Sequence, residues 1–161
     1  MRTPIVMASM LVLCIFSSCQ KEFEDPDNPI ADTTADFRAK VNGVQFVATI
    51  SGGAITDSVI SLAGKSDDGQ QIVFSVVDSG VHVYTLDINN FSNVGAYVTS
   101  NSLNYTSNEG NTPTESGGNL AIVSIDAVNR LMSGTFNFKA FRQQDGKQKI
   151  ITEGIFKNIS Y

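Results

Sequence analysis

The sequence is poor in the residue types on which many catalytic and metal sites depend. It has no tryptophan, one histidine, His82, and two cysteines, Cys14 and Cys19. A hydrolytic triad or a histidine-ligated metal would therefore have to include His82. Because His82 stands between Val81 and Val83 in an apolar stretch, we interpret it as a structural residue.

Basic residues are also scarce. The chain has 11 Lys and Arg against 16 Asp and Glu, a net charge of −5, and its pI is about 4.7. Nucleic-acid binding requires a basic face, so we expect no nucleic-acid partner. A glycine-rich phosphate loop between a strand and a helix is missing too, and we predict no cofactor.

The N-terminus carries a short apolar run. Arg2 precedes residues 5–16, which are apolar apart from Ser9. A membrane-spanning helix needs about 20 apolar residues, and a basic start before a shorter run is typical of a secretory signal. We therefore predict a signal peptide over residues 1–18. Its removal also removes Cys14, which leaves no second thiol for a disulfide or a Cys-type zinc site.

Two small residues, Ser17 and Ser18, come directly before Cys19. This arrangement resembles a bacterial lipobox, in which the cysteine is lipidated and becomes the first mature residue, although Phe16 replaces the usual aliphatic residue. Several acyl chains hold a protein on a membrane stably, whereas one chain does so only marginally. We predict lipidation of Cys19, with a membrane as partner. Ordinary cleavage that leaves Cys19 as a free thiol is the alternative.

An acidic stretch follows Cys19 and resembles the export signal of surface lipoproteins of Bacteroidetes. The residues of this candidate signal are Gln20, Lys21, Glu22, Glu24 and Asp25. The resemblance implies a lipid-anchored protein of the outer membrane that faces outward; the periplasmic face is the alternative. Residues 19–35 are acidic and contain two prolines, so we predict a flexible tether.

The first part of the remaining chain predicts a β-hairpin over residues 37–50. Asn42-Gly43 favours a two-residue type I′ turn, because both residues tolerate a positive φ. This register places three apolar pairs on one face: Val41 with Val44, Ala39 with Phe46, and Phe37 with Ala48.

A second hairpin is predicted over residues 59–77. A two-residue turn would set Lys65 against Ile72, and a slip of one residue moves a whole apolar set to the wrong face. We therefore predict a three-residue loop, 67–69, with Gly69 in the left-handed conformation. The resulting pairs are Leu62 with Phe74 and Ile60 with Val76.

Further strands are predicted from alternating apolar residues. They cover residues 81–88, 97–105 (at an edge), 120–125, 131–141 and 150–156, while 106–119 form a long exposed loop that is either functional or disordered. We predict one all-β domain over residues 36–161, with about eight to ten strands and no long helix. The architecture is an antiparallel β-sandwich or a closed β-barrel, of which a lipocalin-like barrel is one form.

Acids and tyrosines are the remaining candidates for a site. Asp67, Asp68 and Asp126 could serve a hydrolase, but they stand in predicted turns, where aspartate is favoured for local hydrogen bonds. The spacing of an EF-hand is missing, and we predict no metal. Tyr84, Tyr97 and Tyr105 could form a carbohydrate platform, although core packing suits them better.

Four segments resemble a family of Bacteroidetes lipoproteins of unknown function. They are FRAKVNGVQF at 37–46, SGGNLAI at 116–122, SGTFNF at 133–138 and ITEGIF at 151–156. The resemblance implies an exported, lipid-anchored, all-β domain, and it brings no established activity and no catalytic residues. Thr33 and Ser58 stand in short patterns that match O-glycosylation sites of the same bacteria.

Together these observations favour a non-catalytic binding module for a glycan, a small ligand or an envelope protein. The alternatives are a structural accessory subunit of an envelope complex and a carboxylate-dependent hydrolase. The sequence alone identifies no ligand-binding residue.

Overall fold

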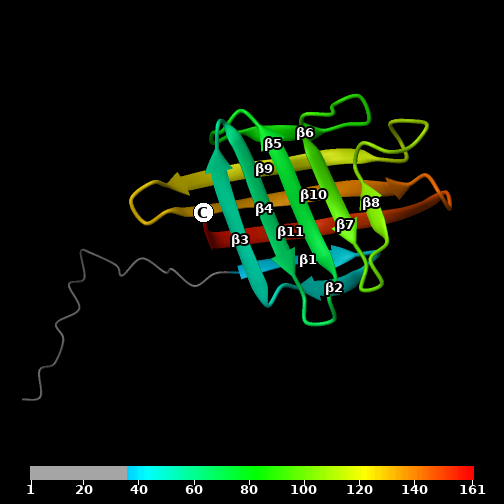
Figure 1. Ribbon diagram of the computed structural model, residues 1–161, viewed down its shortest axis with the longest axis horizontal. Coiled ribbons are helices and arrows are strands. Elements are labelled where there is room, and N and C mark those ends of the chain that lie inside the picture. The colour runs from blue at the N-terminus through cyan, green and yellow to red at the C-terminus, as the bar shows by residue number, and fades with distance from the viewer. Residues whose placement is uncertain (1–35) are drawn as a thin grey trace, which may run out of the picture. The chain divides into compact units, whose positions relative to one another are not determined.

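The computed structural model describes residues 36–161, which contain eleven strands and no helix (Figure 1). This confirms the all-β prediction, with one strand more than the upper end of the expected range. No helix in this part of the chain is long and apolar enough to cross a membrane. The strands are β1 (Asp36–Val41), β2 (Val44–Val47), β3 (Ile50–Thr56), β4 (Val59–Lys65), β5 (Gln71–Val77), β6 (Val83–Leu86), β7 (Val94–Val98), β8 (Asn104–Thr106), β9 (Gly117–Asp126), β10 (Leu131–Arg142) and β11 (Lys147–Ser160).

The strands form one continuous antiparallel sheet that curls into two layers. We call β2, β1, β11, β10, β9 and β6, in that spatial order, the first layer, and β3, β4, β5, β7 and β8 the second layer. β8 joins the layers, since it pairs with β7 and also with β10 through Thr106 and Phe141. The strands of the second layer cross those of the first steeply (Figure 1). The result is a half-barrel, related to both a sandwich and a barrel.

Both predicted hairpins have the predicted register. In the first, Asn42 and Gly43 have φ of 50° and 81°, and Val41 pairs with Val44. In the second, Gly69 has a φ of 87° and Leu62 pairs with Phe74. Turn chemistry and apolar alternation agree at these two places, and their agreement sets the register.

Val44 is 71% exposed, although it pairs with the buried Val41 as predicted. One local prediction was wrong. Residues 97–105 form parts of two strands, β7 and β8, and β7 lies between β5 and β8, away from any sheet edge.

One strand, β3, was missed altogether. It forms a hairpin with β4 through a turn at Asp57 and Ser58, which have positive φ values of 49° and 66°. Its sequence, ISGGAIT, has few apolar residues and no clear alternation, so no strand pattern stands out.

The core lies between the two layers and is built from alternate residues of long strands. In β10 the buried residues Met132, Phe136, Phe138 and Ala140 alternate with outward-facing polar ones, as predicted. The ring of Phe74 from the second layer lies 5.0 Å from that of Phe136 and 5.3 Å from that of Phe138. Phe37 is also 5.3 Å from Phe136. These contacting rings occupy the interior between the two layers.

Candidate functional site

A row of uncharged polar side chains crosses the outer face of the first layer. Because side chains alternate between the faces of a strand, the residues next to buried Leu86, Leu120 and Phe138 point outward. Thr85 on β6 pairs with Asn119 on β9, and Asn119 pairs with Asn137 on β10. The hairpin of β9 and β10 and the more distant strand β6 therefore bring their polar residues side by side.

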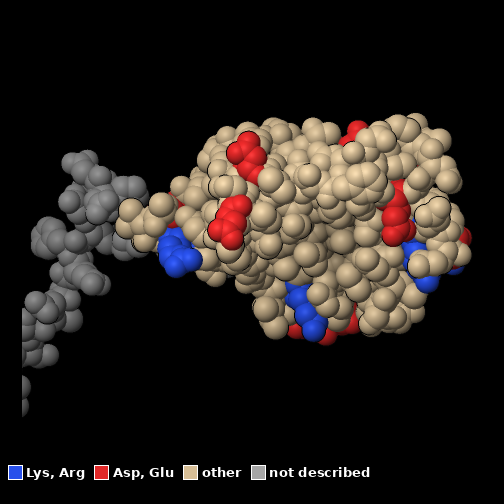
Figure 2. All heavy atoms as spheres, turned by 45° about the horizontal axis from the view of Figure 1, so that its top comes forward, with Lys and Arg blue, Asp and Glu red and all other residues tan. Residues whose placement is uncertain are grey.

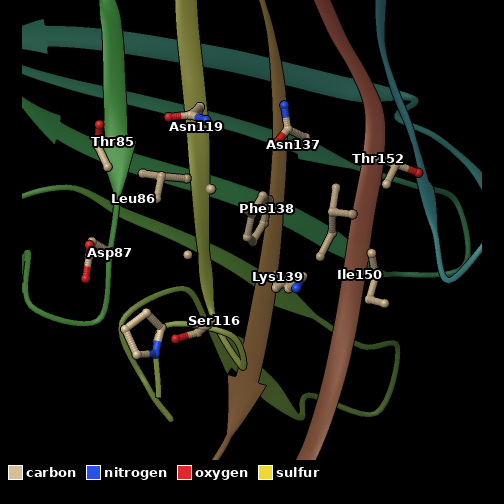
Figure 3. Close-up of a pocket in the computed structure, with 14 residues that line it drawn as sticks. Thr85, Leu86, Asp87, Ser116, Asn119, Asn137, Phe138, Lys139, Ile150 and Thr152 are labelled. Carbon is tan, nitrogen blue, oxygen red and sulfur yellow. The ribbon is translucent and has the colours of Figure 1, made fainter. Parts of the chain in front are cut away.

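This row borders a hollow of about 450 Å³, which we call the polar hollow. Figure 3 shows Thr85, Asn119, Asn137 and Thr152 along one side of it and Asp87, Ser116, Lys139 and Ile150 along the other. The lining residues come from β6 and the residue after it, from β9, β10 and β11, and from the loop before β9. The volume lies within the range of about 300–1,000 Å³ that is usual for small-molecule sites.

Two glycines at the start of β9 line the polar hollow, and neither could carry a side chain. A Cβ on Gly118 would lie 2.2 Å from the carbonyl oxygen of Asn137 and 2.5 Å from the Cα of Phe138. A Cβ on Gly117 would lie 2.9 Å from the carbonyl oxygen of Leu86. The neighbouring strands therefore approach the backbone of β9 closely at these two positions.

The loop of residues 107–116 is attached to the first layer beside the hollow. Lys139 Nζ donates a hydrogen bond to the carbonyl oxygen of Thr114 at 3.1 Å, and Gln148 Nε2 donates to that of Glu115. The backbone N–H of Gln143 donates to the carboxylate of Glu109 at 3.0 Å. The stretch 106–119, predicted as one loop, thus begins and ends in strands, and its middle part forms a wall of the hollow.

Ser116 is the buried polar residue of this wall. It is 3% exposed, and its Oγ has no hydrogen-bond partner among the described residues. A buried polar group left without a partner costs about 1–3 kcal/mol of stability. This Oγ atom is closed off from water, so a molecule bound in the hollow would not reach it in this conformation.

The charged groups that line the hollow are already bound to the protein. The carboxylate of Asp87 accepts a hydrogen bond from the backbone N–H of Asn89 at 2.9 Å, and Lys139 is held by the loop. By contrast, Asn119 and Asn137 are exposed, and their side chains form no hydrogen bond with another described residue. On the face of the molecule that Figure 2 shows, the charged residues are few and lie apart from one another.

The predicted acidic candidates lie on turns of different layers. Asp68, in the loop between β4 and β5, accepts hydrogen bonds from Ser66 and Gln70, which lower the pKa of its carboxyl group. Asp126, the last residue of β9 before the turn to β10, accepts hydrogen bonds from Asn129 and Val128, which lower the pKa of that carboxyl group too. Each carboxylate thus stabilises its own turn. Asp67, beside Asp68, is exposed at the same loop.

The aromatic and histidine candidates divide in two groups. Tyr84, Tyr97 and Tyr105 are at most 4% exposed, which confirms the core-packing interpretation. Burial raises the pKa of the Tyr84 and Tyr97 hydroxyl groups. His82 is exposed just before β6, and its ring lies 4.0 Å from that of Tyr84. Within residues 36–161, no three His, Cys, Asp or Glu residues lie together in a way that could hold a metal.

The remaining predicted residues are easily placed. Ser58 lies exposed in the turn between β3 and β4. Cys19, the export-signal residues 20–25 and Thr33 lie outside the described residues, as do the signal peptide and the tether.

A second hollow lies on the outer face of the second layer. It measures about 430 Å³ and is lined largely by small residues of β3 and β4. We call it the glycine groove, and the small residues that define it are Gly52, Ala54, Ser61 and Ala63. It offers few polar side chains, and we do not take it as the candidate site.

Sequence reasoning missed the residues of the polar hollow. Ser116, Asn119 and Asn137 read as ordinary polar positions of a loop and of solvent-facing strands. One signal was available, because asparagine is disfavoured within strands and two of them stand at outward positions of β9 and β10.

Comparison with known proteins gives one match. A family model described as a domain of unknown function (DUF6252) matches residues 33–160, which includes all the residues of the polar hollow. No curated protein and no solved structure matches the chain.

Proposed function

The chain belongs to this family of domains of unknown function, and we propose that its β domain is a non-catalytic module that binds a small polar ligand in the polar hollow. The observation that carries the proposal is the pair Asn119 and Asn137 on neighbouring strands. Each amide can donate and accept hydrogen bonds, and neither is engaged with another described residue. The pair borders a hollow of ligand size.

A thermal-shift screen against a library of diverse small polar molecules tests this proposal. We expect at least one compound to stabilise the wild-type protein, by about 2.7 kcal/mol at a concentration 100 times its Kd. The double variant Asn119→Ala, Asn137→Ala should lose this effect. Thr135→Ala is the matched control, since Thr135 is exposed on the same face of β10, two residues from Asn137. If no compound stabilises the wild type, or if all three proteins respond alike, the proposal is wrong.

The proposal includes a location: a lipid on Cys19 holds the domain on the outward face of the outer membrane. The apolar run before Cys19 and the acidic residues after it support this location. Cys19→Ala should move the protein to the soluble fraction, while Cys14→Ala, which alters the other cysteine, should leave it on the membrane. Retention of the Cys19→Ala protein would contradict a lipid anchor.

The direction of display has its own test. Replacing Glu22, Glu24 and Asp25 by their amides should protect the domain from a protease added to intact cells, if these acids direct it outward. If the protease digests the variant and the wild type equally, these acidic residues do not direct the protein to the cell surface.

A second candidate function, an accessory subunit of an envelope complex, is favoured by apolar residues on the surface. Val44, Val47 and Ile50 are 71%, 52% and 69% exposed; the first two lie at the ends of β2 and the third begins β3. Exposed apolar surface of this kind is often covered by another protein. A stable partner recovered in mild detergent with the wild type, but not with Val44→Lys or Val47→Lys, would support this function over ligand binding.

A further inference from the structure

We propose that a further cavity, which we call the Lys149 pocket, binds a small organic acid through its carboxylate. The pocket measures about 300 Å³, and Asn42, Gln45, Gln70, Tyr97 and Lys149 are the polar residues of its lining. It shares no lining residue with the polar hollow, so this site is independent of the function proposed above.

The Lys149 pocket lies between the two layers. The hairpin of β1 and β2 and the first part of β11 line it from the first layer, and β7 and the residue before β5 line it from the second. Side chains alternate along β11, where Ile151 is buried in the core and Ile150 lies on the outer face beside the polar hollow (Figure 3). Lys149, two residues from Ile151, therefore points inward.

The inward direction of Lys149 brings its charge against two buried rings of the second layer. Its Nζ lies 6.0 Å from the centre of the Tyr97 ring and 5.5 Å from that of Tyr105. The side chain is half-buried, and within residues 36–161 it forms no hydrogen bond and no ion pair. Aromatic rings attract an ammonium group but leave its charge uncompensated, whereas a carboxylate forms a charge-assisted hydrogen bond with it. A bound carboxylate would supply this missing partner.

Two amides add hydrogen-bond donors to the same lining. The Oδ1 of Asn42 accepts a hydrogen bond from the backbone N–H of Ile150 at 2.8 Å, which leaves its Nδ2 for a ligand. The Nε2 of Gln45 donates one of its two N–H groups to the carbonyl oxygen of Phe46 at 3.3 Å and keeps the other. A carboxylate only accepts hydrogen bonds, so it can use these donors together with the ammonium group.

The one acidic group next to the pocket that the hydrogen bonds identify is turned toward its own loop. Asp68 accepts hydrogen bonds from Ser66 and Gln70, and the oxygen of the Gln70 amide accepts one from the hydroxyl of Tyr97. Burial and the charge of Asp68 raise the pKa of Tyr97. Asp68 lines the adjoining hollow, and no aspartate or glutamate stands among the described residues that line the Lys149 pocket. Lys149 thus sets the sign of charge that the pocket accepts.

Apolar side chains of the hairpin favour an acid with an organic body over an inorganic anion. Val41 and Phe46 are buried beside the pocket, and Val44, also in its lining, is 71% exposed. A hydrocarbon group bound here would cover part of Val44, and removing apolar surface from water favours binding.

The test compares three probes on the full purified chain in detergent, with binding followed by NMR spectra of the backbone amides. The probes are butyrate, butyramide, which has the same body without the charge, and inorganic phosphate, which has charge without the body. We expect butyrate to shift the signals of residues 41–46, Tyr97 and Lys149. Butyramide should bind at least about tenfold more weakly, the value of one charge-assisted hydrogen bond, and phosphate should also bind more weakly than butyrate.

Three variants test the role of Lys149. Lys149→Met keeps the length of the side chain without its charge and should lower the affinity for butyrate at least about tenfold, whereas Lys149→Arg should retain binding. Lys147→Met is the matched control, since Lys147 lies two residues earlier on β11 with its Nζ 3.8 Å from the carboxylate of Asp145. It should bind butyrate as the wild type does. The melting temperature of Lys149→Met should not fall, because the mutation removes a charge that has no ion-pair partner.

Several results would overturn the inference: no binding of butyrate, equal binding of butyramide or phosphate, or unchanged affinity in Lys149→Met. The three-probe comparison on the wild type decides the matter even if Lys149→Met does not fold. Butyrate that shifts the signals of Asn119 and Asn137 instead would place the acid in the polar hollow, which would contradict the Lys149 pocket and support the function proposed above. Binding at the Lys149 pocket, by contrast, leaves that function to its own screen.

Discussion

The outer faces of the two layers hold hollows of similar size and different construction. The polar hollow of the first layer measures about 450 Å³ and the glycine groove of the second about 430 Å³. Amides, hydroxyls and a loop border the first, whereas small side chains define the second. Both layers share one core, so the difference arises in residues that the core does not constrain. Volume alone therefore says little about function.

The glycines of the two hollows show the difference most clearly. Gly118 is closely surrounded by the backbone of β10, whereas a Cβ on Gly52 would meet no atom within 4 Å. In the first layer the backbone of the paired strand leaves no room for a side chain at this glycine. In the second layer the groove exists because nothing fills it.

Gly118→Ala should give the largest loss of stability, more than about 4 kcal/mol, since overpacking against backbone cannot be relieved by turning a side chain. Its Cβ would lie 2.2 Å from the carbonyl oxygen of Asn137, so β9 and β10 would have to separate. Urea denaturation measures the change. An unchanged midpoint would show that β9 can move away from β10 without loss of stability. The backbone around Gly118 would then tolerate an added methyl group as readily as the backbone around Gly52.

Phe138→Ala should cost about 3–5 kcal/mol, because it opens a cavity in the core. The ring of Phe138 is 2% exposed, and it contacts Phe74 across the two layers. Ile150→Ala, on the outer face next to the same hollow, is the matched control and should cost much less. Thermal melting of both variants compares the stability that a core side chain contributes with the stability that a side chain beside the hollow contributes. Equal losses would place Ile150 in the core as well.

The fold could be predicted from the sequence where local signals agreed. Asn42-Gly43 and Gly69 set two turns, and the alternation in β10 marked its buried face. β3 was not predicted, because the glycines that leave the groove open also remove the alternation of apolar and polar residues. The glycine content that distinguishes the second layer therefore also removes the sequence signal of one of its strands.

The polar hollow could not be predicted, because it depends on pairing between distant segments. Thr85 meets Asn119 across 34 residues of sequence, and the register between β6 and β9 is set by no local turn. The burial of Ser116 depends on the loop being held to β10 and β11 by Lys139 and Gln148. Neither contact leaves a periodic pattern in the sequence.

Each layer also has a turn stabilised by an aspartate, and these turns should respond to acid in the same direction. The pKa values of Asp68 and Asp126 are lowered from the ordinary value of 3.8 by hydrogen bonds to their carboxylates. A lowered folded-state pKa contributes stability above the unfolded-state pKa, and this contribution is lost as the pH falls through the folded-state value.

The melting temperature should therefore fall below about pH 4. In Asp126→Ala or Asp68→Ala the melting temperature should be lower at neutral pH, and the fall in acid should be smaller. Melting curves between pH 2 and pH 7 measure both effects. If the melting temperature falls less in acid in only one of the two variants, the two turns differ in how much they stabilise the fold.

Gly52→Ala should have the smallest effect, a gain of about 0.4–1 kcal/mol, because alanine restricts the unfolded chain and is free of strain here. Its Cβ would project into the glycine groove, where no atom lies within 4 Å. The variant is the matched counterpart of Gly118→Ala, with the same added methyl group on the other layer, and urea denaturation compares the two directly. A clear loss of stability in Gly52→Ala would mean that the groove is covered in solution, by another part of the chain or by a second copy. In that case the second layer, and not only the first, would carry a surface that the protein uses.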